Sequence, residues 1–172
     1  MNVLVKLGKL LDKHGIGYIV IGSLADHLLG VSMVEPRDID ILVSGEDVGR
    51  LGSVIQQVRD IDILEPIRWR EGGTVRGVYG RALLDGVPID IMANIQLKYL
   101  GKWIFFTYER LHPCTIEAKI NEMITVRIPC PEIQAIADKV LGRMERARAL
   151  ENLTGKKRCS VKINQCLTTI DR

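Results

Sequence analysis

Two aspartates stand two positions apart inside an apolar stretch, and this pattern most restricts how the chain can fold. Asp38 and Asp40 lie within 37–43, where the neighbours are isoleucine, leucine and valine, and this composition predicts a strand. Residues i and i+2 of a strand point to the same face, so the two carboxylates should lie side by side. Their repulsion in apolar surroundings requires a compensating cation. A magnesium ion, which prefers oxygen ligands, is the first candidate.

Short apolar runs alternate with amphipathic segments along the chain. The pattern predicts strands at 18–21, 37–43, 61–68, 74–84, 87–93 and 124–128, and helices at 3–14, 24–29, 46–58 and 132–151. Asp85-Gly86 joins two of these strands and is a strong hairpin signal, so part of the sheet should be antiparallel. We therefore expect an α/β (α+β) fold with a mixed, partly antiparallel sheet flanked by helices.

The length of 172 residues fits one domain, predicted over 1–151, followed by a basic, loosely docked tail over 152–172. An apolar share of 47% and a charged share of 26% are typical of globular proteins. No apolar run is long enough for a membrane-spanning helix, so we expect no membrane partner. The four cysteines form no CxxC pair, which favours free thiols in a reducing cytoplasm over a zinc site.

Gly22, Ser23 and Asp90 complete the predicted site. Gly22-Ser23 directly follows the strand predicted at 18–21. A glycine lets the backbone approach a phosphate, and Ser23 and the amides of the following helix can donate hydrogen bonds to it. Asp90 lies in another apolar strand. It would join Asp38 and Asp40 in holding two metal ions about 4 Å apart, and would take the proton of an attacking hydroxyl.

The acidic pattern occurs twice, because the six residues that begin at Arg37 are repeated from Arg59. Only the first copy has Gly-Ser upstream at the end of a buried strand. The second copy, with Asp60 and Asp62, directly follows a predicted helix, where its charges suit an exposed edge. We therefore assign the metal site to the first copy.

In this order, Gly22-Ser23, Asp38-x-Asp40 and Asp90 resemble the DNA polymerase beta-type nucleotidyltransferase superfamily. The spacing is similar to its small stand-alone branch, which includes abortive-infection toxin nucleotidyltransferases. The resemblance covers residues 15–95. It implies the nucleotidyltransferase fold and two Mg²⁺ ions, with Mn²⁺ as a second candidate. It also implies transfer of a nucleoside monophosphate from a triphosphate such as ATP to a hydroxyl, with release of pyrophosphate.

The late helix of such proteins carries a lysine and, seven residues on, an arginine that contact the triphosphate. Lys139 and Arg146 match these positions, so the resemblance implies that they bind the nucleotide. Ala149 and Asn152 stand where the toxin-like proteins have acids, and no Arg-Thr pair precedes Asp38. These departures argue against the toxin-type activity, but they do not affect the metal site.

The sequence leaves the acceptor open among a small molecule, a protein and an RNA end. A non-catalytic nucleotide-binding or partner module with the same fold is an alternative to the enzyme. A sugar-nucleotide glycosyltransferase is a weaker one, because it gives no role to Gly22-Ser23 or Asp90. The aliphatic and aromatic stretch 97–106 is a candidate surface for a homodimer or a partner chain.

Overall fold

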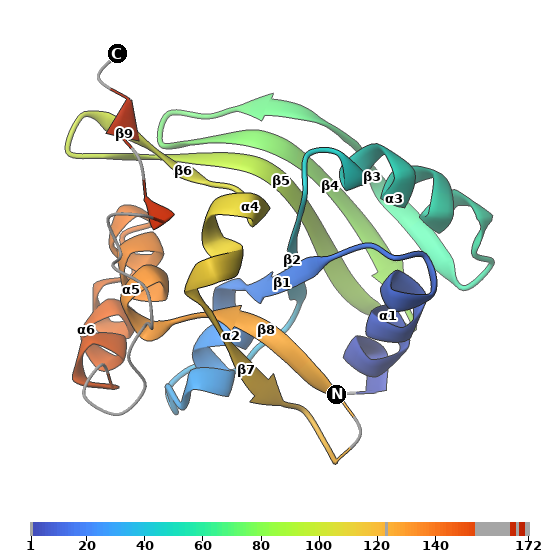
Figure 1. Cartoon of the computed structure of the whole chain (residues 1–172), viewed down its shortest axis with the longest axis horizontal. Helices are drawn as coiled ribbons and strands as arrows, with labels where there is room; N and C mark the ends of the chain where they lie inside the picture. Colours follow the sequence, from blue (N-terminus) through green and yellow to red (C-terminus); the bar gives the residue numbers. More distant parts are fainter. Residues whose placement is uncertain (1, 123, 154–165, 168, 171–172) are drawn as a thin grey trace.

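The computed structural model describes residues 2–122, 124–153, 166–167 and 169–170, and is centred on one mixed sheet (Figure 1). The described strands of this sheet are β1 (Tyr18–Ile21), β2 (Ile39–Val43), β5 (Val87–Tyr99), β4 (Val75–Leu84) and β3 (Ile61–Glu71), in this spatial order, with β6 (Lys102–Phe106) and β9 (Thr169–Ile170) continuing from β5. The β2–β5 pairing is parallel and the others are antiparallel. The expected mixed, partly antiparallel sheet is therefore confirmed.

Helices cover both faces of this sheet, as expected (Figure 1). The helices are α1 (Asn2–Lys13), α2 (Gly22–Leu29), α3 (Asp47–Gln57), α4 (Tyr108–Leu111), α5 (Pro131–Val140) and α6 (Met144–Leu153), with a 3₁₀ turn η1 at His112–Cys114. Leucines of α1 and α3 pack in one apolar cluster with Ile41. Ile133 of α5 packs in a second cluster with Leu42, the next residue along β2. Since neighbouring residues of a strand face opposite ways, these clusters mark the two faces of the sheet.

Strand β5 is longer than the predicted 87–93 and changes phase part-way along. Asn94 has a left-handed backbone (φ 52°), and the pairing of β4 with β5 shifts register between Arg76 and Val78. Such a bulge inserts one extra residue into the alternation of faces. Ile95 and Leu97 consequently join the cluster of Leu42, on the face that also carries the side chain of Asp90.

The single helix predicted at 132–151 is wrong, because the structure has two helices there. Helix α5 ends at Val140, Gly142 takes a left-handed conformation (φ 75°), and α6 begins at Met144. The backbone N–H of Arg143 donates to the carbonyl of Asp138 over 2.8 Å and closes the turn. The apolar periodicity continues across this turn, so the sequence pattern did not show that the helix ends at a left-handed glycine, as many helices do.

A short hairpin of β7 (Thr115–Lys119) and β8 (Thr125–Pro129) forms a second sheet. Just before it, Cys114 is bonded to Cys166 in a disulfide, which corrects the expectation of free thiols for this pair. Their separation of 52 residues matches no sequence motif, and only the fold brings them together. Cys159 and most of the predicted tail 152–172 lie outside the described residues. In the described part of the chain, no helix has the length and apolarity to cross a membrane.

Candidate metal and nucleotide site

The site is built on one row of residues that crosses four strands. Ile21 at the end of β1 lies opposite Asp40 of β2. Asp40 lies opposite Asp90 of β5, and Asp90 lies opposite Arg81 of β4. Paired residues on neighbouring strands project to the same face, so the sheet itself aligns two aspartates and an arginine.

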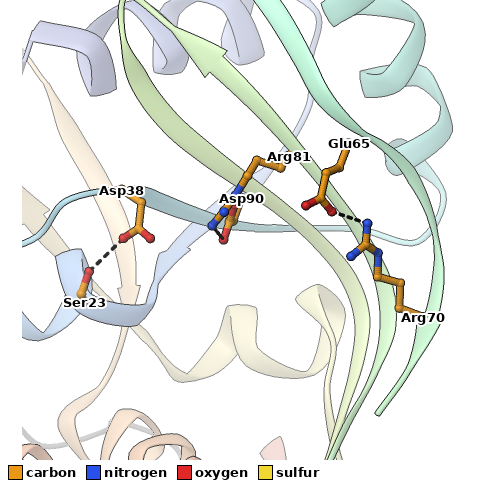
Figure 2. Close-up of polar contacts among 6 residues, drawn as sticks. All are labelled: Ser23, Asp38, Glu65, Arg70, Arg81 and Asp90. Carbon is orange, nitrogen blue, oxygen red and sulfur yellow. Dashed lines mark hydrogen bonds and ion pairs between the residues drawn. The ribbon is translucent and has the colours of Figure 1, made fainter.

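Asp38, Asp40 and Asp90 come together as the sequence predicted, with one carboxylate oxygen of each within 4.8 Å of the others. Asp38 lies just before β2, and its Oδ1 accepts a hydrogen bond from Ser23 Oγ over 3.3 Å (Figure 2). The repeated copy of the motif does not join them. Asp60 is exposed and forms an ion pair with Lys6 at 3.0 Å, and Asp62 is exposed at the start of β3.

Negative charge in this cluster is only partly compensated. Burial raises the pKa of the Asp40 carboxyl to about 7, and the negative charges of Asp38 and Asp90 act in the same direction. The positive charges of Arg143 and Arg81 oppose this rise. A carboxyl whose pKa is raised by burial and by like charge is one that a bound cation would stabilise in its charged form.

Arg81 is a site residue that was not identified from the sequence. Its Nε donates to Asp90 Oδ1 over 2.5 Å and its Nη2 donates to Oδ2 over 2.8 Å, a bidentate pair that Figure 2 shows beside Asp38. The signal was present, because a two-residue turn at Asp85-Gly86 places residues 81 and 90 opposite each other. Further out on the sheet, Glu65 and Arg70 form a separate pair in β3 (Figure 2).

Gly22 lies close against Asp40 because it lacks a side chain. Its φ is +66°, and an added Cβ would lie 2.0 Å from Asp40 Oδ2, far inside van der Waals contact. Its carbonyl accepts a hydrogen bond from Gln134 Nε2 over 3.1 Å, which ties the start of α2 to α5. Position 22 therefore needs glycine for its backbone conformation and for the approach of Asp40.

A cleft of about 860 Å³ opens over the cluster, between the sheet and the α5–α6 pair. Its polar lining comprises Ser23, Glu35, Arg37, Asp38, Asp40, Arg81, Asp90, Gln134, Asp138, Arg143 and Arg146. Apolar residues continue the lining along β5 and β6, among them Met92, Leu97 and Phe106. The cleft therefore combines the acidic cluster, several cations and an apolar wall.

The cations of the late helices differ from the sequence prediction. Arg146, which was predicted to contact the nucleotide, lines the cleft, and so does Arg143, which was not identified from the sequence. Lys139 is not among the lining residues and forms an ion pair with Glu151. The nucleotide-binding role predicted for Lys139 thus gains no support from its position.

No protein-family model and no curated protein matches this chain. Solved structures do match. A candidate nucleotidyltransferase from Thermotoga maritima superposes with a TM-score of 0.69 and 23% identity, over 90% of this chain and 92% of the other. This chain has the nucleotidyltransferase fold. The fold expected from the acidic motifs is therefore confirmed.

Two structures of the antibiotic-resistance factor ANT(2″)-Ia share the nucleotidyltransferase fold. The solution structure gives a TM-score of 0.57 at 16% identity, covering 96% of this chain and 85% of that one. The crystal structure, in complex with adenylyl-2″-tobramycin, gives 0.54 at 16% identity, covering 90% and 94%. The match extends over most of each chain, so the whole fold is shared.

The residues of the site fit a divalent metal ion. All three acids offer carboxylate oxygens, the ligand type that Mg²⁺ and Mn²⁺ accept. Burial, and then the negative charges of Asp38 and Asp90, raise the pKa of Asp40, and a bound cation would stabilise its charged form. Gly22 leaves space beside the Asp40 carboxylate on the side of the helix start.

Proposed function

We propose that this chain is a metal-dependent nucleotidyltransferase, which moves a nucleoside monophosphate from a nucleoside triphosphate to a hydroxyl and releases pyrophosphate. The observation that carries the proposal is the convergence of Asp38, Asp40 and Asp90 within 4.8 Å. The start of helix α2 adjoins these acids, and Arg143 and Arg146 are among the cations that line the cleft above them. The shared fold is compatible with this chemistry, but the function has to be argued from the residues of the site.

Asp38, Asp40 and Asp90 would hold Mg²⁺, with Mn²⁺ as a second candidate. When bound, the metal would neutralise phosphate charge and make the acceptor hydroxyl easier to deprotonate. The Ser23 hydroxyl and the free amides at the start of α2 would donate hydrogen bonds to phosphate oxygens. Arg143 and Arg146 line the same cleft and would balance the charge of the leaving pyrophosphate.

In the transfer step, the acceptor oxygen forms a bond to the α-phosphorus while the bond from that phosphorus to the bridging oxygen breaks. Pyrophosphate leaves with the electron pair, and the acceptor proton passes to Asp90. Arg81 holds the Asp90 carboxylate through two hydrogen bonds and thereby fixes its orientation. Positioning of this kind is the main contribution that phosphoryl transfer requires from protein side chains.

The decisive experiment measures pyrophosphate release from labelled ATP, CTP, GTP and UTP with Mg²⁺ and a panel of hydroxyl acceptors. Asp40→Asn should abolish turnover. Asp62→Asn is the matched control, because it makes the same change in the repeated motif at an exposed position, and it should keep wild-type turnover. If the protein binds nucleotide in the presence of magnesium but shows no turnover with any acceptor, the non-catalytic module is favoured instead. Equal turnover in both variants would refute the assigned site.

The acceptor that best suits the cleft is a small molecule with an apolar surface. Beyond the acids the floor is formed by Met92, Ile95 and Leu97 of β5 and by Phe106 of β6. Among the described lining residues outside the metal cluster, the acids are Glu35 and Asp138, and Asp138 faces Arg143 at 3.6 Å. Such a wall suits a neutral, partly apolar compound better than a polycation.

This part of the proposal is tested by comparing acceptors of similar size. A neutral alcohol with an apolar body should be modified with a higher kcat/KM than tobramycin, which carries several amines. The reverse order would refute the assignment of the apolar wall to the acceptor while leaving the nucleotidyl-transfer proposal intact.

A further inference from the structure

Two buried carboxyl groups belong to the helices around the cleft, and the proposed chemistry does not use them. Asp26 of α2 and Asp138 of α5 are both 0% exposed. Among the described residues, none of their four carboxyl oxygens accepts a hydrogen bond of adequate distance and angle. Their contacts with guanidinium groups are ion pairs: Arg146 Nη1 lies 3.5 Å from Asp26 Oδ2, and Arg143 Nη1 lies 3.6 Å from Asp138 Oδ1.

Burying two acids next to each other is unfavourable unless cations compensate them. Burial raises the pKa of both carboxyls, and the negative charge of Asp26 raises that of Asp138 further. At Asp26 the Gln134 side chain opposes this rise most, followed by the positive charges of Arg146 and Arg143. At Asp138 the charges of Arg143 and Arg146 oppose it. An uncompensated buried carboxylate costs several kcal/mol in typical proteins, so each acid constrains where the two guanidinium groups lie.

The same two arginines face the cleft. Arg143 and Arg146 are partly exposed, with 41% and 32% of the side chain accessible, and both line the cleft above the metal cluster. The charge of Arg143 acts on Asp40, which places that guanidinium near the metal cluster. Each arginine therefore has a buried acid on one side and the nucleotide cleft on the other.

Asp138 also fixes the backbone that carries Arg143. Its carbonyl accepts the Arg143 N–H over 2.8 Å at the turn where Gly142 ends α5. Asp26 lies one helical turn beyond Gly22-Ser23 on α2, so its contact with Arg146 joins the proposed phosphate-binding helix to α6. The buried pair thus links the three helices around the phosphate end of the cleft.

We propose that Asp26 and Asp138 are positioning residues, which hold Arg146 and Arg143 toward the phosphates of the bound nucleotide. This inference rests on the proposed nucleotidyl transfer. A long arginine side chain loses considerable rotamer entropy when it binds an anion. An acid that already restricts the guanidinium lowers that cost in the same way as any preorganised ligand contact.

The first test is a double-mutant cycle on the affinity for a non-hydrolysable ATP analogue with Mg²⁺. Asp138→Asn and Arg143→Gln should each weaken binding about tenfold, as is common when a supporting contact is lost. Because Asp138 acts through Arg143, adding Asp138→Asn to the Arg143→Gln variant should have no further effect. Additive losses, or wild-type affinity in Asp138→Asn, would overturn the proposal.

Two controls separate positioning from a general loss of structure. Glu145→Gln removes an exposed acid beside Arg146 and should leave nucleotide affinity unchanged. If Asp138→Asn does not fold, the cycle of Asp26→Asn with Arg146→Gln applies the same criterion on the other pair. Mg²⁺ affinity measured without nucleotide should stay at the wild-type value in Asp26→Asn, Arg146→Gln and Glu145→Gln, since these variants change neither a proposed metal ligand nor Arg143, whose charge acts on Asp40.

A ligand-free measurement decides the positioning independently of the proposed function. In ¹⁵N NMR of the arginine side chains, the Nε signals of Arg143 and Arg146 should show restricted motion in the wild type. Asp138→Asn should mobilise Arg143, and Asp26→Asn should mobilise Arg146. Unchanged signals would overturn the inference. If the signals change as expected but no triphosphate binds, the proposed function fails while the positioning remains.

Discussion

Replacing Gly22 by alanine separates backbone strain from the geometry of the metal cluster. The φ of Gly22 is +66°, where a residue with a side chain costs about 1–2 kcal/mol. In a domain of this size that corresponds to a fall in Tm of about 2–8 °C. In addition, the new Cβ would lie 2.0 Å from Asp40 Oδ2 and 2.9 Å from its Cγ, so Asp40 has to move.

Gly15→Ala is the matched control. Gly15 has nearly the same conformation, with φ +61°, but an added Cβ would meet nothing within 4 Å. Both variants should show a similar loss of free energy of unfolding from strain. Only Gly22→Ala should also lose metal binding, by at least about tenfold, because it displaces a metal ligand.

Chemical denaturation measures the strain, and isothermal titration with Mg²⁺ or Mn²⁺ measures the metal affinity. Turnover of the acceptor should fall about a hundredfold in Gly22→Ala, the usual effect of an ångström-scale misplacement. The reasoning is refuted if Gly22→Ala binds the metal as the wild type does, or if Gly15→Ala loses metal affinity equally.

Three further predictions follow from the structure. Because the pKa of Asp40 is raised to about 7, Mg²⁺ must displace a proton from this carboxyl below that pH. The Mg²⁺ affinity should therefore fall by up to about tenfold per pH unit below 7 and level off above 7. A Mg²⁺ affinity independent of pH between 5.5 and 8 would contradict this prediction. Arg81→Met should lower the metal-free stability by about 1–3 kcal/mol, since it leaves the buried Asp90 carboxylate without its bidentate partner. Mg²⁺ should then raise the Tm of this variant more than that of the wild type, and an equal rise would contradict the compensating role of Arg81. The Cys114–Cys166 disulfide closes a separation of 52 residues and should therefore add about 4 kcal/mol to the free energy of unfolding. Dithiothreitol should lower the urea midpoint of the wild type but not that of Cys114→Ser. Equal wild-type midpoints with and without dithiothreitol would show that the bond does not form.

Local patterns were sufficient for most of the elements. The hairpin at Asp85-Gly86 and the strands on either side of it follow from turn chemistry and apolar runs, and the structure has them as β4 and β5. The N-terminus of α3 follows a similar local rule, since the N–H of Asp47 donates to Ser44 Oγ over 2.9 Å. Such features need only a few consecutive residues, so one sequence shows them.

The break between α5 and α6 depends on more than periodicity. Apolar positions keep helical spacing through 132–151, and a single glycine inside a helix is often tolerated. What fixes the turn is Gly142 in a left-handed conformation together with the Arg143–Asp138 contacts. The conformation of Gly142 and the contacts of Asp138 with Arg143 therefore set a boundary that periodicity did not show.

The sequence by itself determined the acidic pair, the third acid and the Gly-Ser step, because each depends on neighbours within a few positions. The tertiary structure alone decided that the buried carboxyls of Asp26 and Asp138 interact, that the charge of Arg143 acts on Asp40, and that Cys114 bonds to Cys166. These contacts join segments tens of residues apart, and their formation depends on how whole helices pack on the sheet. Short-range periodicity carries no information about that packing, so the charges around the acids became visible only in the folded chain.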